Sequence, residues 1–189
     1  MPTEHEVQFA RYLEGLVERG DRGALASLRR GLGKPPWEAA EMYPYVVRWL
    51  PHDVNAWTDA CHFFVASLFA VHQVSWRGQE DQEGPSNLGA SLARLARKTG
   101  STTVEKRLIG LLNSHADDLS ARLRPAVAIL ASESEAIDWA QLLHDSLRWG
   151  SQRRWVQRRW ASAFWAAAQP DVGQDATSPE TIQAEEQPC

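Results

Sequence analysis

The stretch 53–74 constrains the fold more than any other part of the chain, because it is apolar on almost every side of a helix. Its apolar side chains are Val54, Trp57, Cys61, Phe63, Phe64, Val65, Leu68, Phe69 and Val71. An amphipathic helix needs one apolar stripe, whereas a helix that is apolar all round is buried on every side. We therefore expect 53–74, with Asp53 as its N-cap, to be the central helix of an N-terminal helical bundle.

The rest of the chain also shows helical periodicity. Apolar residues recur at intervals of three and four between glycine, proline and capping residues. The predicted helices are 4–18, 22–32, 37–50, 88–98, 103–112, 116–130, 137–149 and 151–168. A capping box at Thr102–Glu105 begins one of them, and the short helix before it places Arg94, Arg97 and Lys98 on its outer surface. No segment alternates with a two-residue period. The sequence predicts an all-α fold.

A polar segment divides these helices. Residues 77–86 are rich in Glu, Gln and Gly and are typical of a solvated loop. The predicted organisation is two small helical bundles, 1–76 and 87–168, joined by the polar loop 77–86. The segment 169–189 is acidic and rich in Gln, Pro, Thr and Ser, so it has little to bury and is predicted to be a disordered acidic tail.

The charge of the chain is unevenly distributed. The net charge is −4, but residues 94–168 carry 12 Lys and Arg against 7 Asp and Glu, while 169–189 carry 5 acidic residues and no basic one. Because the distribution matters more than the sum, the acidic total does not exclude nucleic acid as a partner.

The sequence also bears on location. The longest apolar run, 63–71, is shorter than the roughly 20 residues that a membrane span needs. Residues 1–6 lack the basic start and apolar stretch of a secretory signal. With only Cys61 and Cys189, neither a disulfide framework nor a thiolate metal site is indicated. We expect a cytoplasmic protein with free thiols and no membrane partner.

Two patterns partly resemble known metal-binding and phosphate-binding sites. His144 and Asp145 are residue types found in the ligand clusters of all-helical metal phosphohydrolases, but neighbours on a helix point about 100° apart. Gly31–Lys34 resembles a phosphate loop, yet Pro35 follows the lysine and no strand precedes the glycines. Neither pattern meets the requirements of its class. We expect no catalytic residue, no metal and no cofactor, and keep the phosphohydrolase as an alternative.

The last predicted helix has tryptophan on both of its sides and arginine on one of them. One side, expected in the core, holds Val156, Trp160, Ala163, Phe164 and Ala167. The other holds Arg154, Trp155, Arg158, Ser162 and Trp165. Fixed positive charge beside flat aromatic surface can neutralise phosphates and stack on bases. The alternative is cation–π contact within the helix and packing on a neighbour.

Further basic residues gather at two other places. Arg29 and Arg30 lie in the last turn of the helix 22–32 and Lys34 just after it, where they satisfy terminal carbonyls through the helix dipole or contact phosphates. Arg107, Arg122 and Arg124 are equally compatible with ordinary surface charge. Together with Arg154 and Arg158 they are the eight candidate nucleic-acid contacts.

Several short segments occur together in one order. They are Leu28-Arg29-Arg30-Gly31-Leu32-Gly33, then Trp57 with the stretch 62–72, then the segments 87–92, 105–112 and 137–143, and last Trp160-Ala161-Ser162-Ala163-Phe164-Trp165. In this order they resemble the CRISPR-associated CasB family, the small subunits of the type I-E Cascade complex. The resemblance extends from about Val7 to Ala168 and leaves only the acidic tail unmatched.

The resemblance implies a non-catalytic, all-helical subunit present in two copies beside the backbone and large subunits of Cascade. It further implies a basic surface that meets CRISPR RNA, target DNA and the displaced strand and thereby stabilises the R-loop. On matching positions, this role falls to Arg29, Arg30, Arg107, Arg122 and Arg124. The competing hypothesis is a protein-interaction scaffold whose basic face docks on acidic neighbours without touching nucleic acid.

Overall fold

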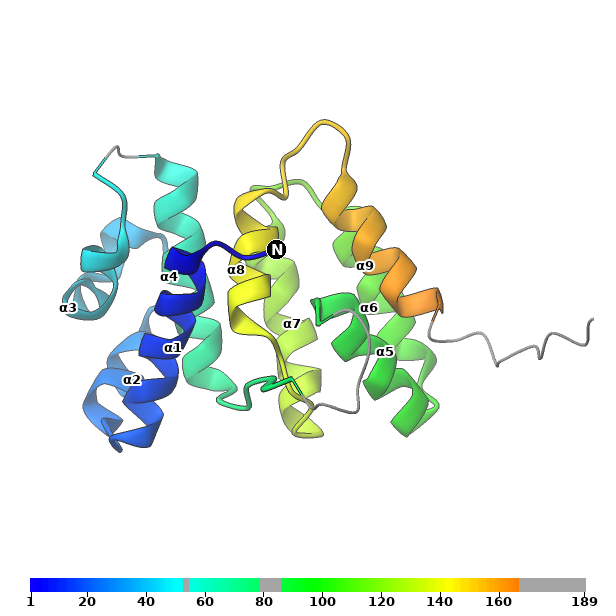
Figure 1. The fold of residues 1–189 in the computed structure, drawn as a ribbon, viewed down its shortest axis with the longest axis horizontal. Helices are drawn as coiled ribbons and strands as arrows, with labels where there is room; N and C mark the ends of the chain where they lie inside the picture. Colours follow the sequence, from blue (N-terminus) through cyan, green and yellow to red (C-terminus); the bar gives the residue numbers. More distant parts are fainter. Residues whose placement is uncertain (53–54, 79–85, 167–189) are drawn as a thin grey trace, which may run out of the picture.

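A computed structural model describes residues 1–52, 55–78 and 86–166 of the chain, and apart from one isolated bridge the regular structure in these ranges is helical (Figure 1). The α-helices are α1 (Glu4–Glu18), α2 (Arg22–Arg30), α3 (Tyr43–Val46), α4 (Ala56–Val71), α5 (Leu88–Thr99), α6 (Thr102–Leu112), α7 (Leu119–Ser132), α8 (Trp139–Leu147) and α9 (Trp155–Ala166). The prediction of an all-α fold is confirmed. None of these helices is both long and apolar enough to cross a bilayer.

Helix α4 is central, as its all-round apolar sequence predicted. Every residue from Cys61 to Ala70 is buried, and α4 packs against α2 on one side and α7 and α8 on the other. The helix begins after Asn55, whose side chain accepts a hydrogen bond from the Trp57 amide at 2.9 Å. It ends at Val71, three residues earlier than predicted. The predicted cap Asp53 lies outside the described residues.

The predicted helix 37–50 is wrong. In its place the chain forms three short 3₁₀ turns, Pro36–Glu38, Ala40–Met42 and Val47–Trp49, around the single turn of α3. Proline lacks the backbone N–H that continues an α-helix, and its ring clashes with the preceding turn. Pro36 begins the first 3₁₀ turn and Pro44 lies in the first turn of α3. Apolar spacing predicted helical character correctly but not the interruption by Pro44.

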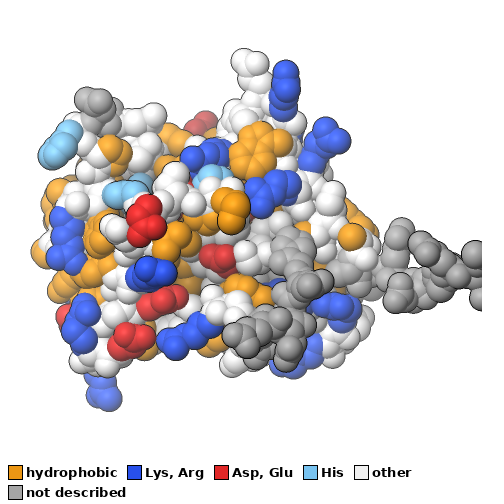
Figure 2. Space-filling model, viewed as in Figure 1, with side chains coloured by type: hydrophobic (Ala, Val, Ile, Leu, Met, Phe, Trp, Pro, Cys, Tyr) orange, Lys and Arg blue, Asp and Glu red, His pale blue; other side chains and the backbone are white. Residues whose placement is uncertain are grey.

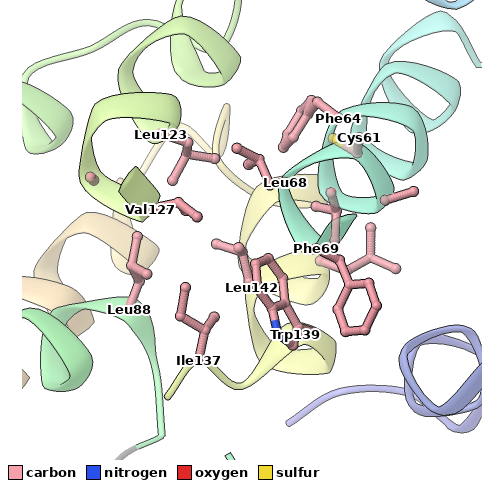
Figure 3. Close-up of a cluster of buried hydrophobic side chains, with 14 of the residues drawn as sticks. Cys61, Phe64, Leu68, Phe69, Leu88, Leu123, Val127, Ile137, Trp139 and Leu142 are labelled. Carbon is pink, nitrogen blue, oxygen red and sulfur yellow. The ribbon is translucent and has the colours of Figure 1, made fainter. Parts of the chain in front are cut away.

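The buried apolar side chains of the two halves form one continuous cluster. Figure 3 shows Leu68 and Phe69 of α4 facing Leu123 of α7 and Trp139 and Leu142 of α8. Helix α1 also packs against α8. The division at 77–86 stays a prediction, and residues 79–85 of that loop lie outside the described residues. The described parts of both halves nevertheless share a core.

The chain that leaves α4 is fastened to the segment before α8. Ser75 and Ile137 form an isolated parallel bridge, with the Trp76 amide donating to the Ile137 carbonyl at 2.9 Å. Arg94 lies 4.2 Å from the centre of the Trp76 ring and donates to Glu135 at 2.5 Å. Its side chain is 16% exposed. The prediction that Arg94 lies on the outer surface is therefore wrong, because stacking and a carboxylate draw it inward.

Helices α5 and α9 approach closely because Gly89 has no side chain. A Cβ atom at this position would lie 2.2 Å from the Trp160 carbonyl oxygen. Val156, Trp160, Ala163 and Phe164 are buried on the inner side of α9, as the periodicity predicted, whereas Ala167 lies outside the described residues. Nearby, the N-cap of α6 is Ser101 and not the predicted Thr102, since the Ser101 hydroxyl accepts from the Thr103 amide.

Candidate nucleic-acid interface

Arg29 lies at the C-terminal end of α2 and reaches across to α4. Its exposed side chain donates two hydrogen bonds to the Ala70 carbonyl, at 3.2 Å from Nε and 2.8 Å from Nη2. The last carbonyls of a helix have no partner within it, and a cation there also compensates the helix dipole. Arg29 therefore stabilises the end of α4 instead of its own helix. A guanidinium has five N–H donors, so others remain for a ligand.

Arg124 of α7 lies against the turn that follows α2. A Cβ atom on Gly33 would be 2.7 Å from Nη1 of Arg124, and Gly33 has a φ of +81°, which favours glycine. A groove of about 380 Å³ runs along this contact, with Leu32, Val71 and Arg124 in its lining. The fold thus brings Arg124, from the second half of the chain, beside the turn that carries Lys34 in the first half.

We call this region the basic end, comprising Arg29, Arg30, Lys34 and Arg124. All four side chains are exposed. Arg30 also donates to the Ser27 hydroxyl at 3.1 Å, a local contact on the surface of α2. The sequence placed three of these residues together, and the fold adds the fourth.

Arg107 and Arg122 are exposed on α6 and α7, which pack against each other. Arg122 is two residues from Arg124 and so about 200° away around the same helix. In the part of the chain that the structure describes, no hydrogen bond or ion pair joins Arg107 or Arg122 to the basic end.

A second positive region surrounds the start of α9. Arg154 has a φ of +48°, and its side chain donates to the Leu112 carbonyl at the end of α6. Its own carbonyl accepts from the Arg158 amide at 3.1 Å. Helix N-termini favour acidic residues, but the first turn of α9 has none. The start of α9 therefore carries basic residues and no acidic one, and its helix dipole would also stabilise a bound anion.

A pocket of about 700 Å³ opens beside this helix start; we call it the α9 pocket. Trp155, Arg158 and Ser162 line it from α9, and Asn87 lines it from the N-cap of α5. Trp165, predicted on the same side, instead lies on another surface and donates to Glu105 at 3.2 Å. The predicted outer face is therefore split between two surfaces.

Two polar residues of the α9 pocket escaped the sequence reasoning. Arg159 lies 5.5 Å from the centre of the Trp155 ring, and the i,i+4 spacing of these residues could have indicated it. Asn87 comes from a distant part of the chain. Its only sequence signal is the helix N-cap position before Leu88, which carries no information on α9.

None of the eight predicted contact residues makes an ion pair within residues 1–52, 55–78 and 86–166. The basic residues that do are Arg77, Arg94, Lys98, His144, Arg148 and Arg159. On the face in Figure 2, Lys and Arg side chains gather around the loop before α9 and separately over the N-terminal helices. Over the N-terminal helices acidic side chains lie between the basic ones in Figure 2, so the absence of ion pairs applies to the eight predicted residues and not to the whole basic surface.

His144 and Asp145 belong instead to a buried polar network that we call the polar seam, made of Glu6, Gln141, His144, Asp145, Arg148 and Trp160. His144 donates to Glu6 at 2.8 Å, and Arg148 donates to the other oxygen of Glu6 at 3.0 Å. Asp145 accepts from Trp160 at 2.6 Å and from Gln141 at 2.8 Å. The two residues therefore point to different partners and do not converge on a metal. Across the described residues, no group of three His, Cys, Asp or Glu could hold one.

The pKa values of the two buried carboxyls of the seam, Glu6 and Asp145, are shifted in opposite directions. Burial alone would raise the pKa of Glu6, but hydrogen bonds from the Thr3 amide, His144 and Arg148 outweigh it, so the pKa lies below its ordinary value. For Asp145, burial raises the pKa, and the hydrogen bonds from Trp160 and Gln141 offset only part of that effect. These are the signs of a structural network in which Glu6 is held as a carboxylate.

Comparison with known families identifies the chain. Residues 24–165 match the family model of CRISPR-associated protein Cse2. The chain belongs to the Cse2 family. A Cse2 relative from Thermus thermophilus is 34% identical over 158 residues, which are 82% of this chain and 85% of the relative. The resemblance to the CasB family stated from the sequence is thereby confirmed.

Solved structures of the family have the same fold. The crystal structure of CasB from Thermus thermophilus aligns with a TM-score of 0.71 and 34% identity, covering 85% of this chain and 97% of that one. A chain of a CRISPR RNA-guided surveillance complex aligns with a TM-score of 0.74 and 27% identity, covering 87% and 93%. Similarity therefore extends over nearly all of the described part of this Cse2 protein.

Proposed function

We propose that this chain is a non-catalytic small subunit of a type I-E Cascade surveillance complex in the cytoplasm. It lies beside backbone and large subunits and a second copy of itself, and needs no cofactor. Its basic surface holds the CRISPR RNA–target DNA region and the displaced strand, and so stabilises the R-loop. Family membership and the fold shared with a chain of a surveillance complex support this assembly.

One observation carries the nucleic-acid role: the eight exposed basic residues have no acidic partner among the described residues. A surface arginine that serves only solubility is commonly interspersed with acids. Here Arg124 is brought from a distant part of the chain beside Gly33, the residue before Lys34, which concentrates positive charge. Such a surface neutralises phosphates and releases counterions, the sequence-independent source of affinity for nucleic acid.

Modest contacts suffice for this role. Replacing a DNA duplex by an RNA–DNA heteroduplex is nearly balanced in free energy, so backbone contacts to the strands can tip the exchange. Base pairing reads the sequence, and the protein needs only charge in the right places. A basic surface can make such contacts without any catalytic residue.

The test is the salt dependence of binding to single-stranded DNA. The variant Arg30→Gln/Arg107→Gln/Arg124→Gln removes three charges that have no ion pair in the described chain. Filter binding across a salt series should show the slope of log K against log salt flattened by about 2, since each neutralised phosphate contributes roughly 0.7 on single strands. Circular dichroism should show unchanged helicity.

The matched control removes charges that acids already neutralise. Arg77 pairs with Glu18 at 3.4 Å and Lys98 with Glu133 at 3.2 Å, and both basic side chains are more than half exposed. Arg77→Gln/Lys98→Gln should leave the slope nearly unchanged. Equal slopes for wild type and the triple variant would overturn the nucleic-acid role.

The scaffold hypothesis has an observation of its own. Trp37, Tyr43 and Val47 are exposed by 74%, 41% and 47% in the irregular segment between α2 and α4, and exposed apolar side chains are typical of protein contacts. If the triple variant bound DNA normally but failed to enter a reconstituted complex, the scaffold would be the better account.

A further inference from the structure

We propose that the α9 pocket binds a single unpaired base of the nucleic acid, stacked against Trp155, with its phosphate neutralised by Arg158. This inference rests on the proposed nucleic-acid role and adds the kind of strand that is bound: an unstacked single strand and not a closed duplex. The argument comes from the shape of the pocket, the aromatic ring, the charges and one amide.

The pocket is formed by one stripe of α9. Trp155, Arg158, Arg159 and Ser162 recur at intervals of three and four, so they share a side of the helix, and Trp155, Arg158 and Ser162 line the same cavity with Arg159. Its volume of about 700 Å³ lies within the range of small-molecule sites, about 300–1,000 Å³. A nucleobase with its sugar fits such a space.

Trp155 is held in place from the protein side. Its ring is partly buried against the core and makes an edge-on contact with His144, with centroids 6.2 Å apart. A ring fixed on one side and facing a cavity on the other loses little conformational freedom when a base stacks on it. Stacking is tolerant of sequence because every base has a flat aromatic face.

The charges around the ring favour a nucleotide over an apolar side chain of a protein. Arg158 is exposed and makes no ion pair or side-chain hydrogen bond in the described chain. Arg159 lies over the Trp155 ring, while its Nη1 is 3.9 Å from Asp145. Asp145 thus partly neutralises Arg159 and leaves Arg158 as the free cation for a phosphate.

Asn87, the N-cap of α5, supplies a polar group to the lining of the pocket. The residue is 2% exposed, and its side-chain oxygen accepts from the Ala90 amide at 3.1 Å as the N-cap of α5. That bond fixes the amide and leaves its NH₂ group as a donor for a base carbonyl or ring nitrogen. Gly89 permits the close contact of α5 with α9 that brings Asn87 here.

Only an unpaired base can use this arrangement. In a duplex both faces of a base are covered by its neighbours, and taking one out costs a few kcal/mol. A displaced strand has its bases already unpaired. The stacking energy of the α9 pocket is therefore available to a single strand and not to a duplex of the same charge.

The experiment compares two probes of equal charge: a 12-nucleotide oligothymidylate and an abasic strand of the same length, each titrated against the full chain. Wild type should bind oligothymidylate about fivefold or more tightly than the abasic strand, in line with the energies of base–aromatic stacking. In Trp155→Leu the ratio of the two Kd values should fall to about one, while Trp155→Phe should retain part of it.

Trp165 provides the matched control, because it is a tryptophan of the same helix, 38% exposed, outside the α9 pocket. Trp165→Leu should keep the wild-type ratio. Asn87→Asp keeps a capping oxygen but replaces the donor by a negative charge, so it should lower the ratio with circular dichroism unchanged, and it tests the pocket even if Trp155→Leu fails to fold.

The outcomes separate the two proposals. If wild type binds both probes equally, or if a folded Trp155→Leu or Asn87→Asp keeps the wild-type ratio, the base pocket is wrong while the charge-based role stands. If wild type binds neither probe at any salt concentration, the proposed function fails and the base pocket fails with it.

Discussion

The polar seam and the basic end use charged residues in opposite ways. In the seam, Glu6 receives hydrogen bonds from His144, Arg148 and the Thr3 amide, and its side chain is 4% exposed. In the basic end, Arg124 and Lys34 are exposed and have no acidic partner in the described chain. Charge in the seam joins α1 to α8, whereas charge in the basic end is left available for a ligand.

The difference teaches that burial and pairing, not residue type, separate the arginines held in the core of this fold from those proposed to bind nucleic acid. Arg94 and Arg148 were as basic in the sequence as Arg124, yet each is held by a carboxylate of low exposure. Removing a partner from a buried pair leaves an uncompensated polar group, which is strongly destabilising. Removing an exposed, unpaired charge changes stability by no more than about 0.5 kcal/mol.

The largest effect that would sharpen this comparison is expected at Asp145. In Asp145→Ala, the Trp160 ring N–H and the Gln141 amide both lose their buried acceptor. Each unsatisfied donor costs about 1–3 kcal/mol, so the free energy of unfolding should fall by about 2–6 kcal/mol. Urea unfolding followed by tryptophan fluorescence measures it.

The matched control is Asp145→Asn, which keeps one oxygen for the Trp160 ring N–H, while its NH₂ group needs the Gln141 amide to turn its own oxygen inward; it should lose less stability than alanine. A loss of under about 1 kcal/mol in the alanine variant would mean that the seam is not a stabilising network. The seam and the basic end would then no longer differ in what their charged residues contribute to stability.

A smaller effect, with a pH signature, is expected at Glu6. Glu6→Gln keeps the length of the side chain but loses the charge that His144 and Arg148 contact, and should cost about 1–3 kcal/mol at pH 7. Because folding lowers the pKa of Glu6, its stabilisation is present above the unfolded value of about 4.3 and is lost as the pH falls below it. The gap between wild type and variant should therefore close below about pH 4.

Thermal unfolding of both proteins from about pH 7 to about pH 3 tests this. A gap that stays constant over the whole range would show that the charge of Glu6 contributes nothing and that only its shape matters.

The sequence was sufficient for what depends on local periodicity. The all-round apolar character of 61–70 placed α4 in the centre, and the spacing of Val156, Trp160 and Phe164 identified the buried side of α9. It failed where a single residue changes the local backbone, as Pro44 does in 36–49. It also failed for Arg94, because the ring and carboxylate that hold it come from Trp76 and Glu135, far away in the chain.

The candidate site was predictable only in part for the same reason. Arg29, Arg30 and Lys34 are neighbours in sequence, so their proximity could be predicted. The contact of Arg124 with Gly33 depends on how α7 packs against the ends of α2 and α4, and the position of Asn87 in the α9 pocket depends on the approach of α5 to α9. Such long-range juxtapositions have no signature in one sequence.

The smallest expected effect lies at Arg29, which belongs to the basic end yet shares one property with the seam. Its guanidinium donates to the Ala70 carbonyl at the end of α4, so Arg29→Gln should lower the free energy of unfolding by about 1 kcal/mol, the value of one net hydrogen bond. Arg124→Gln, which removes the same charge without such a bond, should change it by less than about 0.5 kcal/mol. Both variants should weaken DNA binding to a similar extent. Urea unfolding and filter binding on the same two proteins separate the contributions: equal stability with unequal binding would mean that the bond to Ala70 carries no weight and that the basic end is not a single surface.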